Sequence, residues 1–119
     1  MKTASAKSKG RELQKFVSRK IREVFQLNEE DVVSRPMGSP GCDIMMSTLA
    51  LSKLPLSIEC KNTKTFPSLS ALDQAFANTN GKALMPAAVW KPPGKAMDKS
   101  IVYMNIEHFL WLLKSKEQE

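Results

Sequence analysis

Two carboxylates and one lysine near the middle of the chain have the types and spacing that phosphate chemistry requires. Asp43 lies in one candidate strand, and Glu59 and Lys61 lie two residues apart in another, on the same face of it. Two oxygen ligands beside a cation suit Mg²⁺ and a phosphate, because Mg²⁺ prefers carboxylates and keeps most of its waters. Lys61 would orient an attacking water and oppose charge on the phosphate oxygens. The pattern predicts phosphodiester hydrolysis.

The same residues also have an ordinary structural explanation. A Glu-X-Lys triplet arises by chance about once per 250 positions at average residue frequencies. Asp43 could be a turn residue that accepts backbone N–H groups, and Glu59 with Lys61 could be a solvated pair on a strand.

The charge distribution indicates a polyanionic partner. The chain has 18 Lys and Arg against 12 Asp and Glu, which gives a net charge of +6. Eight of the first 22 residues are basic, and Glu12 is the only acid among them. Such a field attracts a phosphate backbone with a strong dependence on salt. A solvated helix face and a soluble tail would explain this pattern equally well.

Length and composition indicate one α/β domain inside the cell. A chain of 119 residues with 42% hydrophobic residues has the size and composition of one globular unit. The longest apolar stretches are far shorter than the roughly 20 residues that span a bilayer, so no membrane contact is expected. The basic start lacks the apolar segment of a secretory signal. Cys42 and Cys60 are therefore expected to be reduced thiols.

The hydrophobic pattern predicts alternating helices and strands that would position these residues. Apolar residues recur every three or four positions over 10–27, which is typical of an amphipathic helix, with Ser8 as its N-cap and a flexible basic tail over residues 1–8. Further helices are expected at 67–79 and 106–114, and strands at 32–35, 42–47, 56–61, 84–90 and 101–104. The short connection between 42–47 and 56–61 favours a hairpin of antiparallel neighbours. The whole of 9–119 is expected to form one domain, a small mixed sheet flanked by helices.

Two motifs resemble a known enzyme superfamily. Gly41, Cys42 and Asp43, followed by Ile58, Glu59, Cys60 and Lys61, resemble the motif of the PD-(D/E)XK nucleases. The order of segments over about 9–113 is similar to archaeal-type Holliday junction resolvases and to virus-type replication-repair nuclease modules. These segments are the Lys-Gly-Arg-Glu-Leu run from residue 9, the Val-Ser-Arg run from residue 33, the Gly-Ser-Pro loop and a downstream helix with a glutamine.

The resemblance implies a fold, a cofactor and roles for single residues. It implies a restriction-endonuclease-like core of αβββαβ order and cleavage of DNA with Mg²⁺ or Mn²⁺. Asp43 and Glu59 would bind the metal, and Lys61 would serve the nucleophile. Glu12 would complete the metal site from the first helix, and Gln74 matches a glutamine on the helix after the catalytic strands.

Basic and polar residues around these motifs are candidates for contacts with DNA. The set comprises Lys9, Arg11, Lys15, Arg35, Ser39 and Lys64. Lys91 and Lys95 lie in a proline-rich loop that could hold a second DNA segment or could be a simple connection. The apolar run 109–113 would leave one side of the last helix free, and a homodimer is a natural use of it.

Together these features predict a metal-dependent endonuclease that acts as a Holliday junction resolvase on branched DNA. Its role would lie in recombination, repair or phage DNA processing. Two alternatives stay open from the sequence. One is a nuclease of single strands, flaps or specific sites on the same fold. The other is a non-catalytic DNA-binding protein that uses only its basic first helix.

Overall fold

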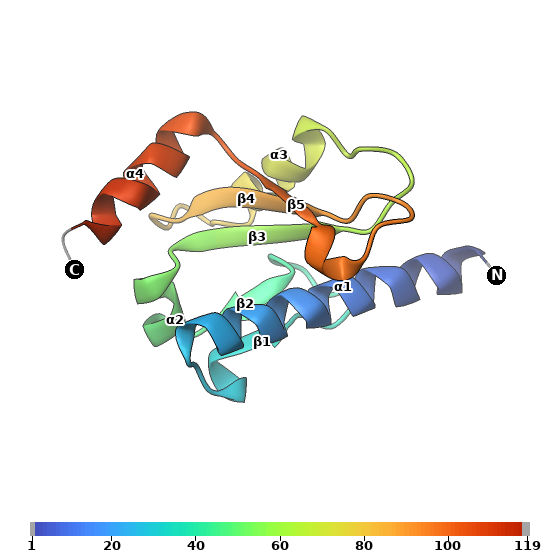
Figure 1. Cartoon of the computed structure of the whole chain (residues 1–119), viewed down its shortest axis with the longest axis horizontal. Coiled ribbons are helices and arrows are strands. Elements are labelled where there is room, and N and C mark those ends of the chain that lie inside the picture. The colour runs from blue at the N-terminus through green and yellow to red at the C-terminus, as the bar shows by residue number, and fades with distance from the viewer. Residues whose placement is uncertain (1, 118–119) are drawn as a thin grey trace.

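The computed structural model describes residues 2–117 and has a central sheet region between helices (Figure 1). In chain order the elements are α1 (Lys2–Phe25), β1 (Val32–Ser34), β2 (Ile44–Met46), α2 (Thr48–Lys53), β3 (Leu56–Lys61), α3 (Leu69–Ala77), β4 (Met85–Trp90), β5 (Ile101–Tyr103) and α4 (Ile106–Lys116). Short 3₁₀ turns occupy Glu29–Asp31 and Met97–Lys99. The predicted α/β class, with a mixed sheet and flanking helices, is confirmed.

The strands form two hydrogen-bonded groups. β3 pairs in parallel with β4, and β4 pairs antiparallel with β5, so the larger group has the order β3-β4-β5. β1 and β2 form an antiparallel pair. The predicted hairpin of residues 42–47 with 56–61 is wrong, because β2 pairs with β1 and the six-residue helix α2 lies between β2 and β3. Ser47 caps α2 by accepting a hydrogen bond from the Ala50 backbone N–H.

The core lies between α1 and the strands. Leu13 and Val17 of α1 pack with Ile44 of β2 and with Ile58 and Cys60 of β3, and all five side chains are buried. These α1 residues are four positions apart and therefore share one face of the helix. The amphipathic pattern of α1 was predicted correctly, but its start was not. Helix α1 begins at Lys2, so Ser8 is no N-cap and residues 2–8 are helical.

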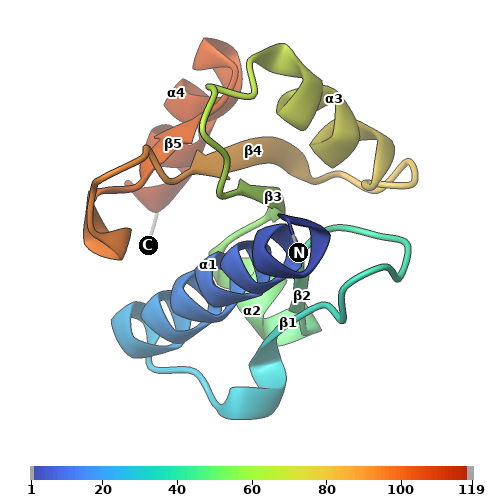
Figure 2. The ribbon, with the colours of Figure 1, turned by 90° about the vertical axis from the view of Figure 1, so that its right-hand side faces the viewer.

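Helix α3 covers the opposite face of the larger strand group (Figure 2). Ala71 and Ala75 are fully buried there, and their small side chains allow the helix to approach the strands closely. The Ser57 hydroxyl of β3 donates a 2.7 Å hydrogen bond to the Ala75 carbonyl. Because both faces of β3 are covered, Ser57 and Glu59 are buried as fully as the apolar residues that alternate with them.

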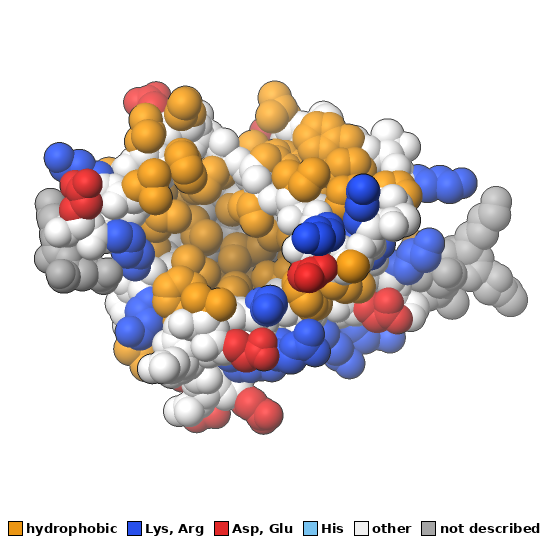
Figure 3. Space-filling model, viewed as in Figure 1, with side chains coloured by type: hydrophobic (Ala, Val, Ile, Leu, Met, Phe, Trp, Pro, Cys, Tyr) orange, Lys and Arg blue, Asp and Glu red, His pale blue; other side chains and the backbone are white. Residues whose placement is uncertain are grey.

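A hollow apolar area remains exposed between α1 and α4 (Figure 3). Phe16 and Ile21 of α1, with Val89 of β4 and Val102 of β5, line a cavity of about 220 Å³ there. The exposed apolar residues of β5 and α4 beside it are Ile101, Val102, Ile106, Phe109, Leu110, Trp111 and Leu113. Only the partly buried Leu112 connects α4 to the core cluster described above. Within residues 2–117, no helix combines the length and apolar character needed to cross a membrane.

Candidate active site

Asp43 lies where the two strand groups meet. Its backbone N–H donates to the Ile58 carbonyl of β3 at 3.0 Å, and its carboxylate Oδ2 accepts the Cys60 backbone N–H at 2.7 Å. The Asp43 carboxylate thus takes the place of a backbone carbonyl and joins the loop before β2 to β3. The expectation that Asp43 could accept a backbone N–H group is confirmed, and the same contact holds its carboxylate beside β3.

Glu59 is the most perturbed carboxyl group of the site. Its side chain is only 5% exposed, and Oε1 accepts a 2.9 Å hydrogen bond from the Asn78 amide Nδ2. Burial raises the pKa of Glu59 to about 7, with further increases from the charge of Asp43 and a hydrogen bond to it. The Asn78 amide and the Lys61 ammonium lower the pKa in part. The charges of Asp43 and Lys61 therefore both act on the carboxyl group of Glu59.

Glu59 and Lys61 open onto one cavity of about 310 Å³, which we call the carboxylate cavity. Ser39 and Gly41 line it from the loop before β2, Gln74 lines it from α3, and Asn78 lines it from the position directly after α3. Gln74 and Asn78 are four residues apart and therefore lie on the same side of the helix. The structure thus brings Glu59, Lys61 and Gln74 to one cavity, and Asp43 lies beside Glu59. Ser39, a candidate for contact with DNA, lines the same cavity.

The donor set fits a divalent cation with oxygen ligands. Asp43 lies beside Glu59, so one ion can meet both carboxylates, and its charge would oppose the burial and the repulsion by Asp43 that together raise the pKa of Glu59. Within residues 2–117, no group of three or more His, Cys, Asp or Glu side chains is arranged to hold a metal. Asp43 and Glu59 would therefore hold the ion with solvent completing its coordination, as Mg²⁺ commonly prefers.

Glu12 does not join this pair. It is exposed on α1 and lines a second cavity of about 310 Å³, the lysine cavity, with Lys9, Lys64 and Lys91. The reason is the pleat of β3. Ile58 and Cys60 face α1, whereas Glu59 and Lys61 lie on the face that α3 covers. A side chain on α1 approaches the opposite side of β3 from Glu59.

The predicted DNA contacts are distributed over the molecule. Lys9 and Lys64 line the lysine cavity together with Asn62, whose amide donates to the Lys9 carbonyl at 3.0 Å. Arg11 and Lys15 are exposed on α1. Arg35 is half-buried, and its Nε donates to the Cys42 carbonyl at 2.6 Å. These cations lie on several sides of the strand that carries Glu59 and Lys61.

Two functional features escaped the sequence analysis. Asn78 holds the Glu59 carboxylate, although the run after α3 predicts only the end of a helix; its four-residue spacing from Gln74 was the available signal. Gly41 has φ of 118°, and a Cβ there would lie 2.5 Å from the Arg35 guanidinium carbon. Glycine is therefore required between the loop and Asp43.

Burial raises the pKa of the free Cys60 thiol well above its usual value.

Comparisons with models of protein families, with curated proteins and with solved structures find no match to this chain.

Proposed function

We propose that this protein is a metal-dependent endonuclease that hydrolyses phosphodiester bonds of DNA, with a restriction-endonuclease-like core of the PD-(D/E)XK type. One observation carries the proposal. The buried carboxyl group of Glu59 lies beside the half-buried Asp43, and Glu59 shares a cavity with Lys61. A fold gains nothing in stability from pressing two acids together, so such a pair is typical of a functional site.

Asp43 and the residues of the carboxylate cavity would divide the chemistry among them. Asp43 and Glu59 would hold Mg²⁺ or Mn²⁺, which supplies charge neutralisation at the phosphate oxygens when bound. Lys61 would donate a hydrogen bond to the attacking water and oppose the negative charge that develops on the phosphate. The Asn78 amide fixes one oxygen of Glu59 and leaves its other oxygen for the ligand. Gln74 and Ser39 would hold the phosphate or water at the rim of this cavity.

The proposed substrate is branched DNA, such as a four-way junction. The net charge of +6 and the cations on α1, at Arg35 and in the lysine cavity support contact with more than one DNA segment. The likeness of the motif order to junction resolvases supports the choice of branched DNA over linear duplex.

The proposal includes a homodimer. Seven apolar side chains of β5 and α4 are exposed beside a hollow area, as described above (Figure 3). Patches of this kind usually mark an interface in a protein of this size. A two-fold dimer would place two carboxylate cavities on one junction, which suits the cutting of two strands.

A cleavage assay with matched variants tests the proposal. Labelled four-way junction, flap, single strand and linear duplex are incubated with Mg²⁺, with Mn²⁺ and with a chelator. We expect cleavage only with metal. Glu59→Gln and Lys61→Ala should reduce the rate by at least about a thousandfold, since each removes an essential group. Glu23→Gln and Lys99→Ala, which alter exposed residues elsewhere, should cleave as the parent does.

Binding is measured alongside cleavage. Because exposed cations supply most of the affinity, Lys61→Ala should bind the junction within a few fold of the parent. Metal-independent cleavage, or cleavage by Glu59→Gln at the parent rate, would show that the assigned residues are wrong. Binding without any hydrolysis would favour the non-catalytic DNA-binding alternative.

A further inference from the structure

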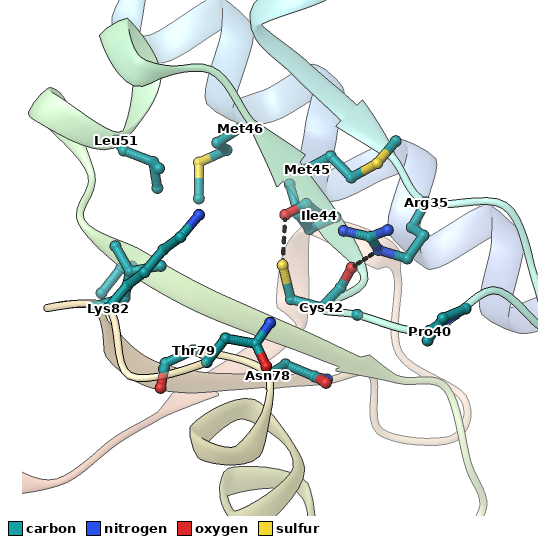
Figure 4. Close-up of a pocket in the computed structure, with 14 residues that line it drawn as sticks. Arg35, Pro40, Cys42, Ile44, Met45, Met46, Leu51, Asn78, Thr79 and Lys82 are labelled. Carbon is teal, nitrogen blue, oxygen red and sulfur yellow. Dashed lines mark hydrogen bonds between the residues drawn. The ribbon is translucent and has the colours of Figure 1, made fainter.

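A larger cavity adjoins the carboxylate cavity. It has a volume of about 510 Å³ and lies between β2, α2 and the segment that follows α3, and we call it the side cavity. Met46 of β2 and Leu51 of α2 face the Lys82 side chain across it (Figure 4). The catalytic residues proposed above do not use this space.

The two cavities share a wall. Pro40, Gly41 and Asn78 line both of them. Asn78 donates through Nδ2 to Glu59, so this one side chain holds a carboxylate of the active site and also borders the side cavity. A phosphate at Glu59 and Lys61 would therefore have its neighbouring nucleotide at the entrance of the side cavity.

The lining of the side cavity combines surfaces that suit a flat heterocycle. Met46, Leu51 and Leu56 supply apolar walls, and a methionine thioether packs well against an aromatic ring. The side chains of Asn78, Thr79 and Asn80 supply polar groups along one side. A bare phosphate would gain nothing from the apolar walls, and a purely apolar ligand would make no use of the polar side.

The charge of the lining favours a nucleotide over a neutral heterocycle. Arg35 and Lys82 are basic, and among the described residues that line the side cavity none is acidic. The guanidinium of Arg35 is held in place, because its Nε donates to the Cys42 carbonyl and because Gly41 leaves space for it (Figure 4). These two cations would face the phosphates on either side of a bound base.

We infer that the side cavity receives the unpaired base of the nucleotide next to the scissile phosphate. This inference rests on the proposed nuclease function and specifies its substrate. A base that is stacked in a duplex cannot enter a pocket, and releasing it costs free energy that is smallest where the base is already unpaired. The protein therefore selects strands that are unpaired at the cleavage site, as at a branch point, a flap or a single strand.

Substrates that lack one base test this inference by cleavage. An abasic tetrahydrofuran nucleotide replaces, in separate substrates, the nucleotide on each side of the scissile phosphate. We expect one of the two substrates to be cut at least about fivefold more slowly than the intact strand by the parent protein. Met46→Trp fills the side cavity, so the ratio between intact and abasic substrates should fall to about one. Equal rates for intact and both abasic substrates in the parent would overturn the inference.

A fluorescence measurement tests the cavity without cleavage. Single-stranded oligonucleotides carrying 2-aminopurine are titrated with protein and Ca²⁺, and fluorescence should rise as the base leaves its stacked neighbours. Lys82→Ala, an exposed position, covers the case in which Met46→Trp fails to fold, and should weaken binding by at least about threefold. Lys99→Ala carries the same charge change outside both cavities and should bind as the parent does.

The cleavage assay and the 2-aminopurine titration together distinguish failure of this inference from failure of the proposed nuclease function. If no DNA is cut with Mg²⁺ or Mn²⁺, the nuclease proposal fails, and the 2-aminopurine titration still decides whether the cavity takes a base. If DNA is cut and no 2-aminopurine strand changes its fluorescence on binding, the cavity takes no base and the nuclease proposal stands.

Discussion

At the scale of single residues, the contact between Asp43 and Glu59 combines a structural and a chemical role. One oxygen of Asp43 accepts the Cys60 N–H, and the same carboxylate contacts Glu59. The Asn78 amide and the Lys61 ammonium only partly offset the loss of solvation at Glu59. The pair is therefore built to receive either a proton or a cation.

The pKa of Glu59 predicts a pH-dependent stability. It is about 7 in the folded protein and 4.5 in a solvated chain, so the folded state keeps a proton that the unfolded state releases between these values. The free energy of unfolding therefore falls as the pH rises from about 4.5 to about 7 and stays lower above. Glu59→Gln removes this loss. The difference in free energy of unfolding between the variant and the parent should therefore rise, in favour of the variant, by about 1 to 3 kcal/mol on going from pH 4 to pH 8.

Urea denaturation in the presence of a chelator measures this difference. Glu23→Gln, at an exposed position on α1, should show the same pH dependence as the parent. If Glu59→Gln and the parent have parallel stability profiles, Glu59 titrates as an ordinary solvated carboxyl.

At the scale of elements, the position of α3 decides the site. Its buried alanines set its distance from β3 and β4, and its C-terminal part carries Gln74 and Asn78 to Glu59. The Ser57 hydroxyl fixes this end of α3, since it donates to the Ala75 carbonyl where the carbonyls of a helix lack partners within the helix.

Ser57→Ala tests the attachment of α3 to β3. The change leaves the buried Ala75 carbonyl without this donor, so the free energy of unfolding should fall by about 1 to 3 kcal/mol. Ser70→Ala removes an exposed hydroxyl of the same helix, which donates a hydrogen bond to the Pro67 carbonyl. This variant should change the free energy of unfolding by less than about 0.5 kcal/mol. Chemical denaturation measures both values. Equal effects of the two variants would show that the Ser57 hydrogen bond contributes no more than a surface contact.

At the scale of the whole molecule, charge and apolar surface are separated. Cations occupy α1, the lysine cavity and the side cavity, whereas seven of the exposed large apolar side chains gather on β5 and α4. Helix α4 is stabilised at its start by the Asn105 side chain, which accepts the Glu107 N–H at 2.8 Å. It thus presents its apolar residues on a formed helix.

This separation predicts a dimer that forms away from the DNA contacts. The parent should sediment as a dimer at micromolar concentration. Trp111→Glu puts a charge at a side chain that is 57% exposed on α4 and should give a monomer. Phe76→Glu, at a side chain that is 68% exposed on α3, should leave the dimer intact. A monomeric parent, or a dimer that persists in Trp111→Glu, would rule out α4 as the interface.

The amino-acid sequence by itself determined the elements and the identity of the central acids. The β3 strand was predicted at its exact bounds, Leu56–Lys61, because apolar side chains that face the core alternate along it with polar side chains that face the carboxylate cavity and α3. The order of helices and strands was predicted apart from α2, whose six residues are too short to show a helical period. Of the predicted site residues, Glu59, Lys61 and Gln74 line one cavity, and Asp43 lies beside Glu59; their catalytic roles stay a prediction.

Only the tertiary structure decided which side of β3 each neighbouring helix covers. Glu12 was expected at the metal pair, but α1 packs on the face of Ile58 and Cys60, so Glu12 lies among lysines instead. Asn78 reaches Glu59 from 19 residues away, and the side cavity is formed by two stretches of the chain, one within residues 35–56 and one within residues 78–84. Local periodicity fixes which residues share a face of one element, whereas the pairing of faces depends on packing between distant segments.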